Sequence, residues 1–330
     1  MGITENDNRE PEYTDDMLTM HHAPIKRLSR PEAPRGFRVT ERDIEILKLV
    51  ARFRFLNSAQ VVKFLGTNSG RILRRLQGLY AHGLLDRPVS QHLQLAALYN
   101  PPLTYGLGRL GAKLLAELGT RIDPALDWTW KNSQSTAPFL AHTLDVAEAV
   151  CAFEHACRAG DARLIDHHEL LPLMPEKTRE LRDPFKLRVS LRSGLKTPLA
   201  LAVIPDRLFS VALTDQTRHN FALELDRSTM PITTKRKTDR SSYAQKIAGY
   251  FHSWREKKHT DTWGFQNFRI LTITPSEKRI ENMLAAQRSI TGGSAPGLFL
   301  YSTPERIAHH GAFDSWTNGK GEIISLLKKV

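Results

Sequence analysis

Apolar residues recur at helical spacing three times in the first third of the chain, and an alternating pattern follows them. Thr40 is a suitable N-cap for the first helix, Ser58 for the second, and Gly83 a suitable end for the third. The pattern predicts, in order, a helix from residue 41, a helix at 58–65, a turn at 66–70, a helix at 71–82, a β-hairpin at 84–99 with its turn at 90–91, and a short strand and helix within 105–119.

Three helices, a tight turn before the third, and a hairpin form the element order of a winged helix-turn-helix. In that fold the third helix enters the major groove of DNA and the hairpin contacts the backbone. Residues 35–120 are therefore assigned to a winged helix-turn-helix DNA-binding domain. A winged helix used to dimerise or to dock another protein is the alternative, which leaves a homodimer open.

Basic residues gather near the start of the predicted third helix. Arg71 and Arg75 lie four residues apart and share a face, Arg74 lies beside them, and the apolar residues take the opposite face. Arginine pairs with phosphate and with guanine edges. Residues 36–119 carry 12 Lys and Arg against 5 Asp and Glu. The residues expected to contact DNA are Arg71, Arg74, Arg75 and Arg87, with Lys235, Arg236 and Lys237 from a basic loop of the second half.

The second half alternates between strand and helix patterns after one long helix. The predicted elements are a helix from about 138 to 160, a strand at 163–166, a strand at 186–191 within a basic insertion at 172–198, strand-like segments at 199–213 and 220–227, a helix at 241–257, a strand at 268–274, a helix at 276–289 and a strand at 298–301. Such β-α-β-α-β alternation implies a mixed sheet with helices on both faces, and so an α/β (α+β) fold class.

The chain of 330 residues is long enough for two domains. Residues 1–34 carry seven acidic residues and show no apolar period, so they are expected to form a disordered acidic tail. Residues 121–137 are expected to be a linker, and residues 138–330 the second domain. Two cysteines, Cys151 and Cys157, exclude a disulfide framework and indicate a cytoplasmic protein.

The net charge of +12 favours an anionic partner. Double-stranded DNA is the expected partner, although a basic surface without a ligand is the alternative. No membrane partner is expected, because the longest apolar run, at 199–204, is far shorter than the ~18 residues a spanning helix needs. No phosphate-binding loop precedes a helix, which argues against ATP hydrolysis. Tyr243, Tyr250, Phe251 and Trp254 could stack on bases, although aromatic residues at these helical spacings more often belong to a core.

Two acidic residues stand at neighbouring strand ends in the predicted sheet. Asp206 follows Pro205 at the start of one strand, and Glu224 lies on the next. Carboxylates from adjacent strands can share one Mg²⁺, which lowers the pKa of a bound water and stabilises charge on a phosphodiester. Isolated acids on strands are more often solvated or paired, and that interpretation stays open.

These residues resemble the proline-aspartate and Glu-x-Lys signature of PD-(D/E)XK nucleases, and their combination with the first half resembles the replication-relaxation family. The resemblance covers about residues 40–310, and its motifs are Tyr105-Gly-Leu-Gly-Arg-Leu-Gly111, His142, Pro205-Asp206, Glu224-Leu-Asp-Arg-Ser-Thr229, and Lys246 with Tyr250. It implies a winged helix followed by a restriction-endonuclease-like domain, encoded by a plasmid or another mobile element. A relaxase or replication initiator is implied as a partner.

The chain departs from the nuclease pattern at one position. Asp226 stands two residues after Glu224, where the signature has lysine. Lys246 on the following helix could supply that lysine, giving a centre of Asp206, Glu224 and Lys246 with Asp226 as a further ligand or orienting group. The centre could instead be inactive, with the fold kept as a platform for DNA or a partner, or Asp226 could form a structural ion pair with Arg227.

The sequence therefore predicts a cytoplasmic DNA-binding accessory protein of a mobile element. Its second domain would either be a Mg²⁺-dependent DNA nickase or nuclease, or hold DNA or a partner without chemistry and without a cofactor. A transcriptional regulator is the rival class.

Overall fold

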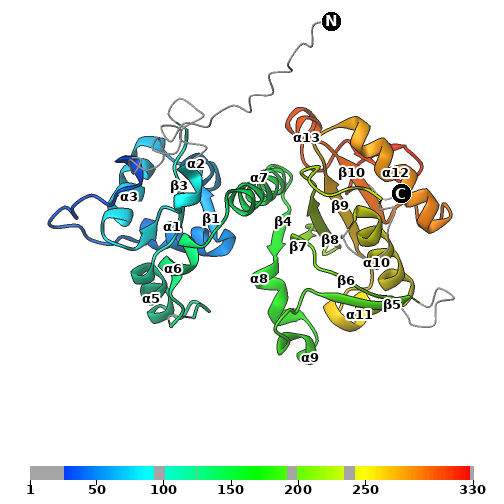
Figure 1. The fold of residues 1–330 in the computed structure, drawn as a ribbon, viewed down its shortest axis with the longest axis horizontal. Coiled ribbons are helices and arrows are strands. Elements are labelled where there is room, and N and C mark those ends of the chain that lie inside the picture. Colours follow the sequence, from blue (N-terminus) through cyan, green and yellow to red (C-terminus); the bar gives the residue numbers. More distant parts are fainter. Residues whose placement is uncertain (1–25, 93–100, 124, 192–198, 234–241, 328–330) are drawn as a thin grey trace, which may run out of the picture. The chain divides into compact units, whose positions relative to one another are not determined.

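The computed structural model describes residues 26–92, 101–123, 125–191, 199–233 and 242–327. The chain forms two compact units (Figure 1), the first comprising residues 1–62 and 67–137, and the second residues 63–66 and 138–330. Each unit has its own sheet and its own buried apolar residues.

The first unit combines helices with a small antiparallel sheet. Its elements are η2 (Lys26–Leu28), α1 (Glu41–Phe53), β1 (Phe55–Asn57), α2 (Ser58–Leu65), α3 (Ser69–Ala81), β2 (Leu85–Asp86), η3 (Val89–Gln91), β3 (Thr104–Leu107), α5 (Arg109–Glu117) and α6 (Trp128–Ser133). The sheet order is β1-β3-β2. The three helices predicted before residue 83 are confirmed, as are the strand and helix within 105–119. The returning hairpin strand, expected at about 95–99, lies outside the described residues, and β2 pairs with β3.

Close backbone contacts explain two glycines of the Tyr105–Gly111 motif. A Cβ atom added at Gly108 would lie 2.4 Å from the carbonyl oxygen of Gly83, and one at Gly111 would lie 2.2 Å from that of Leu84. Both distances are far inside van der Waals contact, and a main-chain atom cannot swing away as a side chain can. The motif therefore lets β3 and α5 pack directly on the chain that follows α3.

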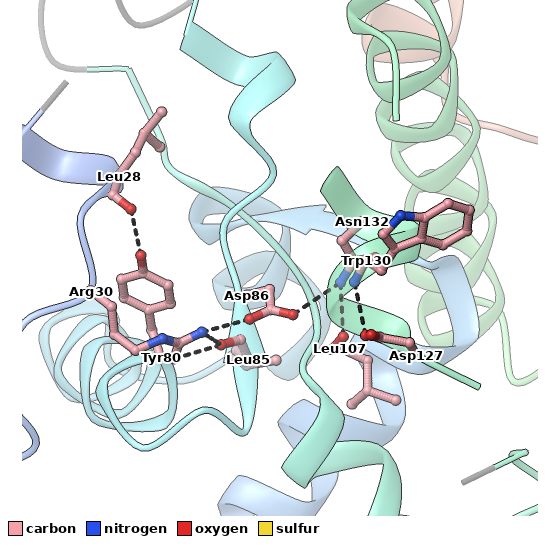
Figure 2. Close-up of polar contacts among 9 residues, drawn as sticks. All are labelled: Leu28, Arg30, Tyr80, Leu85, Asp86, Leu107, Asp127, Trp130 and Asn132. Atoms are coloured by element: carbon pink, nitrogen blue, oxygen red, sulfur yellow. Dashed lines mark hydrogen bonds and ion pairs between the residues drawn. The ribbon is translucent and has the colours of Figure 1, made fainter. Parts of the chain in front are cut away.

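The segment before α1 is docked on the first unit (Figure 2). The Tyr80 hydroxyl donates to the Leu28 carbonyl at 2.5 Å, and Arg30 forms a 2.6 Å ion pair with the buried carboxylate of Asp86. The disorder expected for residues 1–34 therefore does not extend over residues 26–34. Periodicity does not reveal this attachment, because the partners are 52 and 56 residues away and the contacts are polar.

The stretch expected as a linker, 121–137, contains helix α6. Asp127 starts it by accepting a hydrogen bond from the Trp130 amide at 2.9 Å, and Asn132 donates to the Leu107 carbonyl at 2.9 Å (Figure 2). The stretch between the two predicted domains therefore contains a short helix, which an Asp N-cap begins and a buried asparagine attaches to β3.

The second unit is built on a seven-stranded mixed sheet in the order β12-β11-β10-β9-β8-β7-β4, with β5 and β6 forming a separate pair. Its elements are α7 (Ala137–Ala159), β4 (Arg163–Asp166), α8 (His167–Leu170), η4 (Leu171–Leu173), α9 (Glu176–Arg179), β5 (Leu187–Leu191), β6 (Leu199–Val203), β7 (Arg207–Ala212), β8 (Arg218–Leu225), α10 (Tyr243–Arg255), α11 (Lys258–Trp263), β9 (Arg269–Ile273), α12 (Glu277–Thr291), β10 (Phe299–Ser302), α13 (Pro304–His310), β11 (Trp316–Thr317) and β12 (Ile323–Ile324).

Helices cover both faces of this sheet, as expected for its class. On β7, Leu208 packs in the core with α10 and α12, whereas the next residue, Phe209, faces α7, where its ring lies 4.9 Å from that of Phe153. This alternation follows from the period of two along a strand. Strands β8, β9 and β10 run parallel, so their carboxyl ends meet at one edge of the sheet. The α/β mixed fold class is thus confirmed. Among the described residues, no helix is both long and apolar enough to cross a bilayer.

Candidate functional site

The antiparallel pairing of β7 with β8 brings Asp206 and Glu224 together. The register places Arg207 opposite Leu223, so Asp206, one residue before β7, lies beside Glu224 near the end of β8. One carboxylate oxygen of Asp206, Oδ2, accepts a hydrogen bond from the Leu225 amide at 2.7 Å. The predicted meeting of these two acids is confirmed, because a short turn fixes the register of the two strands.

Glu224 is buried, with only 2% of its surface exposed, and helix α10 supplies both of its partners. Lys246 Nζ contacts one carboxylate oxygen, and the Tyr250 hydroxyl donates to the other at 2.6 Å. The two partners lie four residues apart, so they share one face of α10. Ser242 and Gln245 form a capping box that sets where this helix begins.

Burial, together with the neighbouring charge of Asp206, raises the pKa of Glu224 to about 7. Burial alone would lower the pKa of Lys246, but Glu224 and Asp206 together raise it. The site therefore holds a carboxyl group that titrates near neutral pH beside a lysine that stays charged.

His142, on α7, balances the charge of Asp206. Its Nε2 atom lies 3.1 Å from Asp206 Oδ1, and this hydrogen bond raises the pKa of His142. Two acids and two basic groups thus face one another. They line a cavity of about 260 Å³ at the carboxyl edge of the parallel strands.

Asp226 stands where the nuclease signature has lysine, and Arg279 of α12 binds its carboxylate. Arg279 donates to its two oxygens at 2.8 and 2.9 Å, and the Thr274 hydroxyl donates at 2.8 Å. Arg227 instead pairs with Asp145 at 3.0 Å, so the suggested ion pair between Asp226 and Arg227 is wrong. Because consecutive residues in an extended chain point to opposite sides, Asp226 and Arg227 find different partners. A fork of two charged hydrogen bonds makes Asp226 a structural anchor rather than a free ligand.

The donor set of the cavity fits a divalent cation such as Mg²⁺. The ion prefers oxygen ligands and is often held by one or two carboxylates together with waters and substrate phosphates. Asp206 and Glu224 supply two such carboxylates, close enough for the charge of one to raise the pKa of the other. Within the described ranges, no three His, Cys, Asp or Glu side chains gather as a ligand set, so other ligands would have to be water or substrate.

The arginines predicted to bind DNA differ in their surroundings. Arg71 and Arg74 are exposed on α3, whose first turn is capped by Asn68. Arg75 Nε instead donates to Asp43 Oδ1 at 2.8 Å, and the Asp43 side chain is fully buried. Arg75 is thereby tied to α1.

Arg87 is also engaged within the first unit. Its guanidinium lies 4.0 Å from the ring centre of Tyr80 and 5.1 Å from that of Tyr105, and it donates to the Arg27 carbonyl at 2.6 Å. Lys235, Arg236 and Lys237 lie outside the described residues.

Two residues of the site were not found from sequence patterns. Arg279, 53 residues from Asp226, carries no local signal of its role. Tyr250 was placed at the site only through a family resemblance, although its spacing of four from Lys246 is a usable signal for a shared helix face.

The fold and the site define a two-unit α/β protein that gathers two strand carboxylates and a helix lysine at the carboxyl edge of its larger sheet. The family model for replication-relaxation matches residues 47–267, more than half of the chain. The chain belongs to the replication-relaxation family, which indicates a role in replication or relaxation. No curated protein and no solved structure matches the chain.

Proposed function

We propose that this chain is a DNA-binding accessory protein in the replication or relaxation of a plasmid or another mobile element. The observation that carries the proposal is the pair of exposed arginines, Arg71 and Arg74, on the third helix of a unit with winged-helix element order. They are three residues apart and share a helix face, so both can reach one groove or one backbone.

The charge of the chain supports the same partner. A net charge of +12 attracts DNA over the range of the Debye length, ~8 Å at physiological ionic strength. Arg75 and Arg87 contribute to that field but are occupied by Asp43 and by two tyrosine rings. Of the four arginines of the first unit that were predicted to bind DNA, Arg71 and Arg74 are therefore the two proposed to contact it directly.

Duplex binding tests this assignment. We expect the Arg71→Ala and Arg74→Ala variants to bind duplex DNA more weakly, and the slope of log K against log salt to fall by about one for each phosphate that is no longer neutralised. Lys113→Ala, which removes an exposed cation from α5, serves as the matched control. If a variant carrying both substitutions kept the wild-type affinity and salt dependence, α3 would not contact DNA.

Metal-dependent cleavage of DNA is a second candidate function. It is favoured by the convergence of Asp206, Glu224 and Lys246 on one cavity. Asp206 and Glu224 would hold Mg²⁺, which when bound lowers the pKa of a water and stabilises charge on a phosphodiester. Tyr250 fixes the rotamer of Glu224, and Lys246 offers a positive charge to a phosphate oxygen.

A supercoiled plasmid distinguishes cleavage from binding alone. With Mg²⁺ or Mn²⁺, nicking should be abolished in Asp206→Ala, Glu224→Ala and Lys246→Ala but kept in Asp261→Asn, which alters an exposed acid on α11. Salt-sensitive binding without any nicking would favour the alternative, a regulator or scaffold that keeps the fold without chemistry. Binding of a relaxase or a replication initiator would be measured in parallel with the same variants.

A further inference from the structure

A second cavity of about 540 Å³ opens at the amino ends of the parallel strands. Its polar lining includes Arg218, His219 and Asn220 at the start of β8, Arg269 at the start of β9, and Gln266 and Asn267 just before β9. Glu224 lies six positions after Arg218 on β8, a distance of about 20 Å at ~3.3 Å per residue. The cavity is therefore distinct from the candidate site at the carboxyl edge.

The charge of this cavity is one-sided. Two arginines, Arg218 and Arg269, line it, and no Asp or Glu belongs to its described lining. Arg269 donates through Nη1 to the Leu326 carbonyl at 2.9 Å, which uses one of its five N–H donors. Burial lowers the pKa of Arg269, and no carboxylate of the described lining stands beside its charge. An anion is the group that would complete this environment, and phosphate matches the fork of a guanidinium.

Aromatic rings line another part of the cavity. Trp254, at the end of α10, stacks on Phe251 with ring centres 6.2 Å apart, and its half-buried indole borders the cavity. The ring of His219 lies nearly parallel to that of Phe221, with ring centres 6.4 Å apart, and burial lowers the pKa of His219, which favours its neutral form. A Cβ atom added at Gly297 would meet no atom within 4 Å, so the backbone there leaves open room.

We propose that this cavity binds a nucleotide, with its phosphate on Arg218 and Arg269 and its base against Trp254. Cations and a ring surface are the groups that recognise a phosphate and the plane of a base. Asn220 instead accepts a hydrogen bond from the Ser210 hydroxyl at 2.7 Å and donates to the Asn267 carbonyl at 3.0 Å, which holds this wall of the cavity in place. The volume lies in the ~300–1,000 Å³ range of small-molecule sites. A free nucleotide and the phosphorylated end of a DNA strand share this chemistry. The assignment does not depend on DNA contact by α3.

Calorimetric titration of the full chain with dAMP, deoxyadenosine, inorganic phosphate and a 5′-phosphorylated single strand tests the proposal. We expect dAMP to bind more tightly than either fragment, and Arg218→Gln and Arg269→Gln each to weaken it about tenfold or more. Lys113→Gln, which removes an exposed cation from α5, is the control and should leave dAMP binding unchanged. Tighter binding of the phosphorylated strand than of dAMP would assign the strand end as the source, and the reverse would assign the free nucleotide.

A variant that keeps both Arg218 and Arg269 tests the site without the risk that losing an arginine unfolds the unit. Gly297→Val projects a side chain into the open room and should weaken dAMP binding without changing the far-ultraviolet spectrum or the melting temperature. No binding of dAMP or of the phosphorylated strand by the wild-type chain overturns the proposal. Equal affinity for dAMP and inorganic phosphate would show that Trp254 does not bind the base. Undiminished dAMP binding by both Arg218→Gln and Arg269→Gln would show that this cavity is not the site.

Discussion

Replacing Arg75 by alanine tests whether this residue stabilises the first unit or contacts DNA. In the native unit, Arg75 Nε donates to Asp43 at 2.8 Å, and a second guanidinium nitrogen reaches the Arg38 carbonyl at 2.8 Å. Asp43 is fully buried and accepts the amide and hydroxyl hydrogen bonds of Thr40, both at 2.7 Å. The substitution therefore leaves a buried carboxylate with its capping hydrogen bonds but without its counter-ion.

The expected cost follows from burial. Breaking one side of a buried ion pair costs about 3–5 kcal/mol. The Arg75 side chain is 29% exposed, so water partly replaces the missing guanidinium and we expect a destabilisation of about 2–3 kcal/mol. That is a large share of the ~5–15 kcal/mol by which a domain is stable. In an Arg75→Ala, Asp43→Asn double variant, part of the stability should be recovered, since no unpaired charge remains buried.

The pH dependence has a definite sign. Burial would raise the pKa of Asp43, but the hydrogen bonds from Arg75 and Thr40 outweigh it and hold the pKa below the usual 3.8. A carboxyl with a lowered pKa adds stability above the pKa of the unfolded chain and loses it as the pH falls through the folded value. The difference between wild type and Arg75→Ala should therefore be greatest near neutral pH and shrink below about pH 4.

Urea unfolding at several pH values, followed by circular dichroism, measures this difference. Arg71→Ala, on the same helix, is the control and should change the free energy of unfolding by less than about 0.5 kcal/mol. Wild-type stability in Arg75→Ala, combined with weaker DNA binding, would refute the reasoning and return Arg75 to the DNA surface.

Three further predictions concern packing and charge. Gly111→Ala should lower the melting temperature, because contact with the Leu84 carbonyl costs about 1–3 kcal/mol and exceeds the gain of ~1 kcal/mol in helix propensity; a raised melting temperature would contradict the close approach. The pKa of Glu224 rises from 4.5 to about 7 on folding, so the free energy of unfolding of the wild type should fall as the pH rises through that interval. Urea titrations of the Glu224→Gln variant should not show this fall. Asp226→Asn should destabilise the second unit by about 1–3 kcal/mol while duplex binding stays intact, and equal stability would show that the Arg279 fork is dispensable.

Much of the element order could be predicted because periodicity is local. The helices at 41–53 and 58–65 follow from apolar residues three and four apart, and so does the third, which Gly83 follows. That third helix was expected at 71–82, but Asn68 caps it and it begins at Ser69. The meeting of Asp206 and Glu224 was also predictable, since a short turn joins their strands.

The roles of individual charged residues were not predictable in the same way. Arg71, Arg74 and Arg75 look alike in the sequence, yet only Arg75 meets a buried acid, 32 residues away. Asp226 likewise finds Arg279 rather than its neighbour Arg227, because α12 packs beside the end of β8.

Spacing along the chain by itself determined the main helices and strands and the meeting of two carboxylates, since each depends on residues a few positions apart, but it did not reveal α6. Only the tertiary structure decided which arginines stay exposed, which acid is anchored and where a cationic cavity opens. The physical reason is that an ion pair or a cavity depends on three-dimensional distance and burial, and residues far apart in the sequence set both.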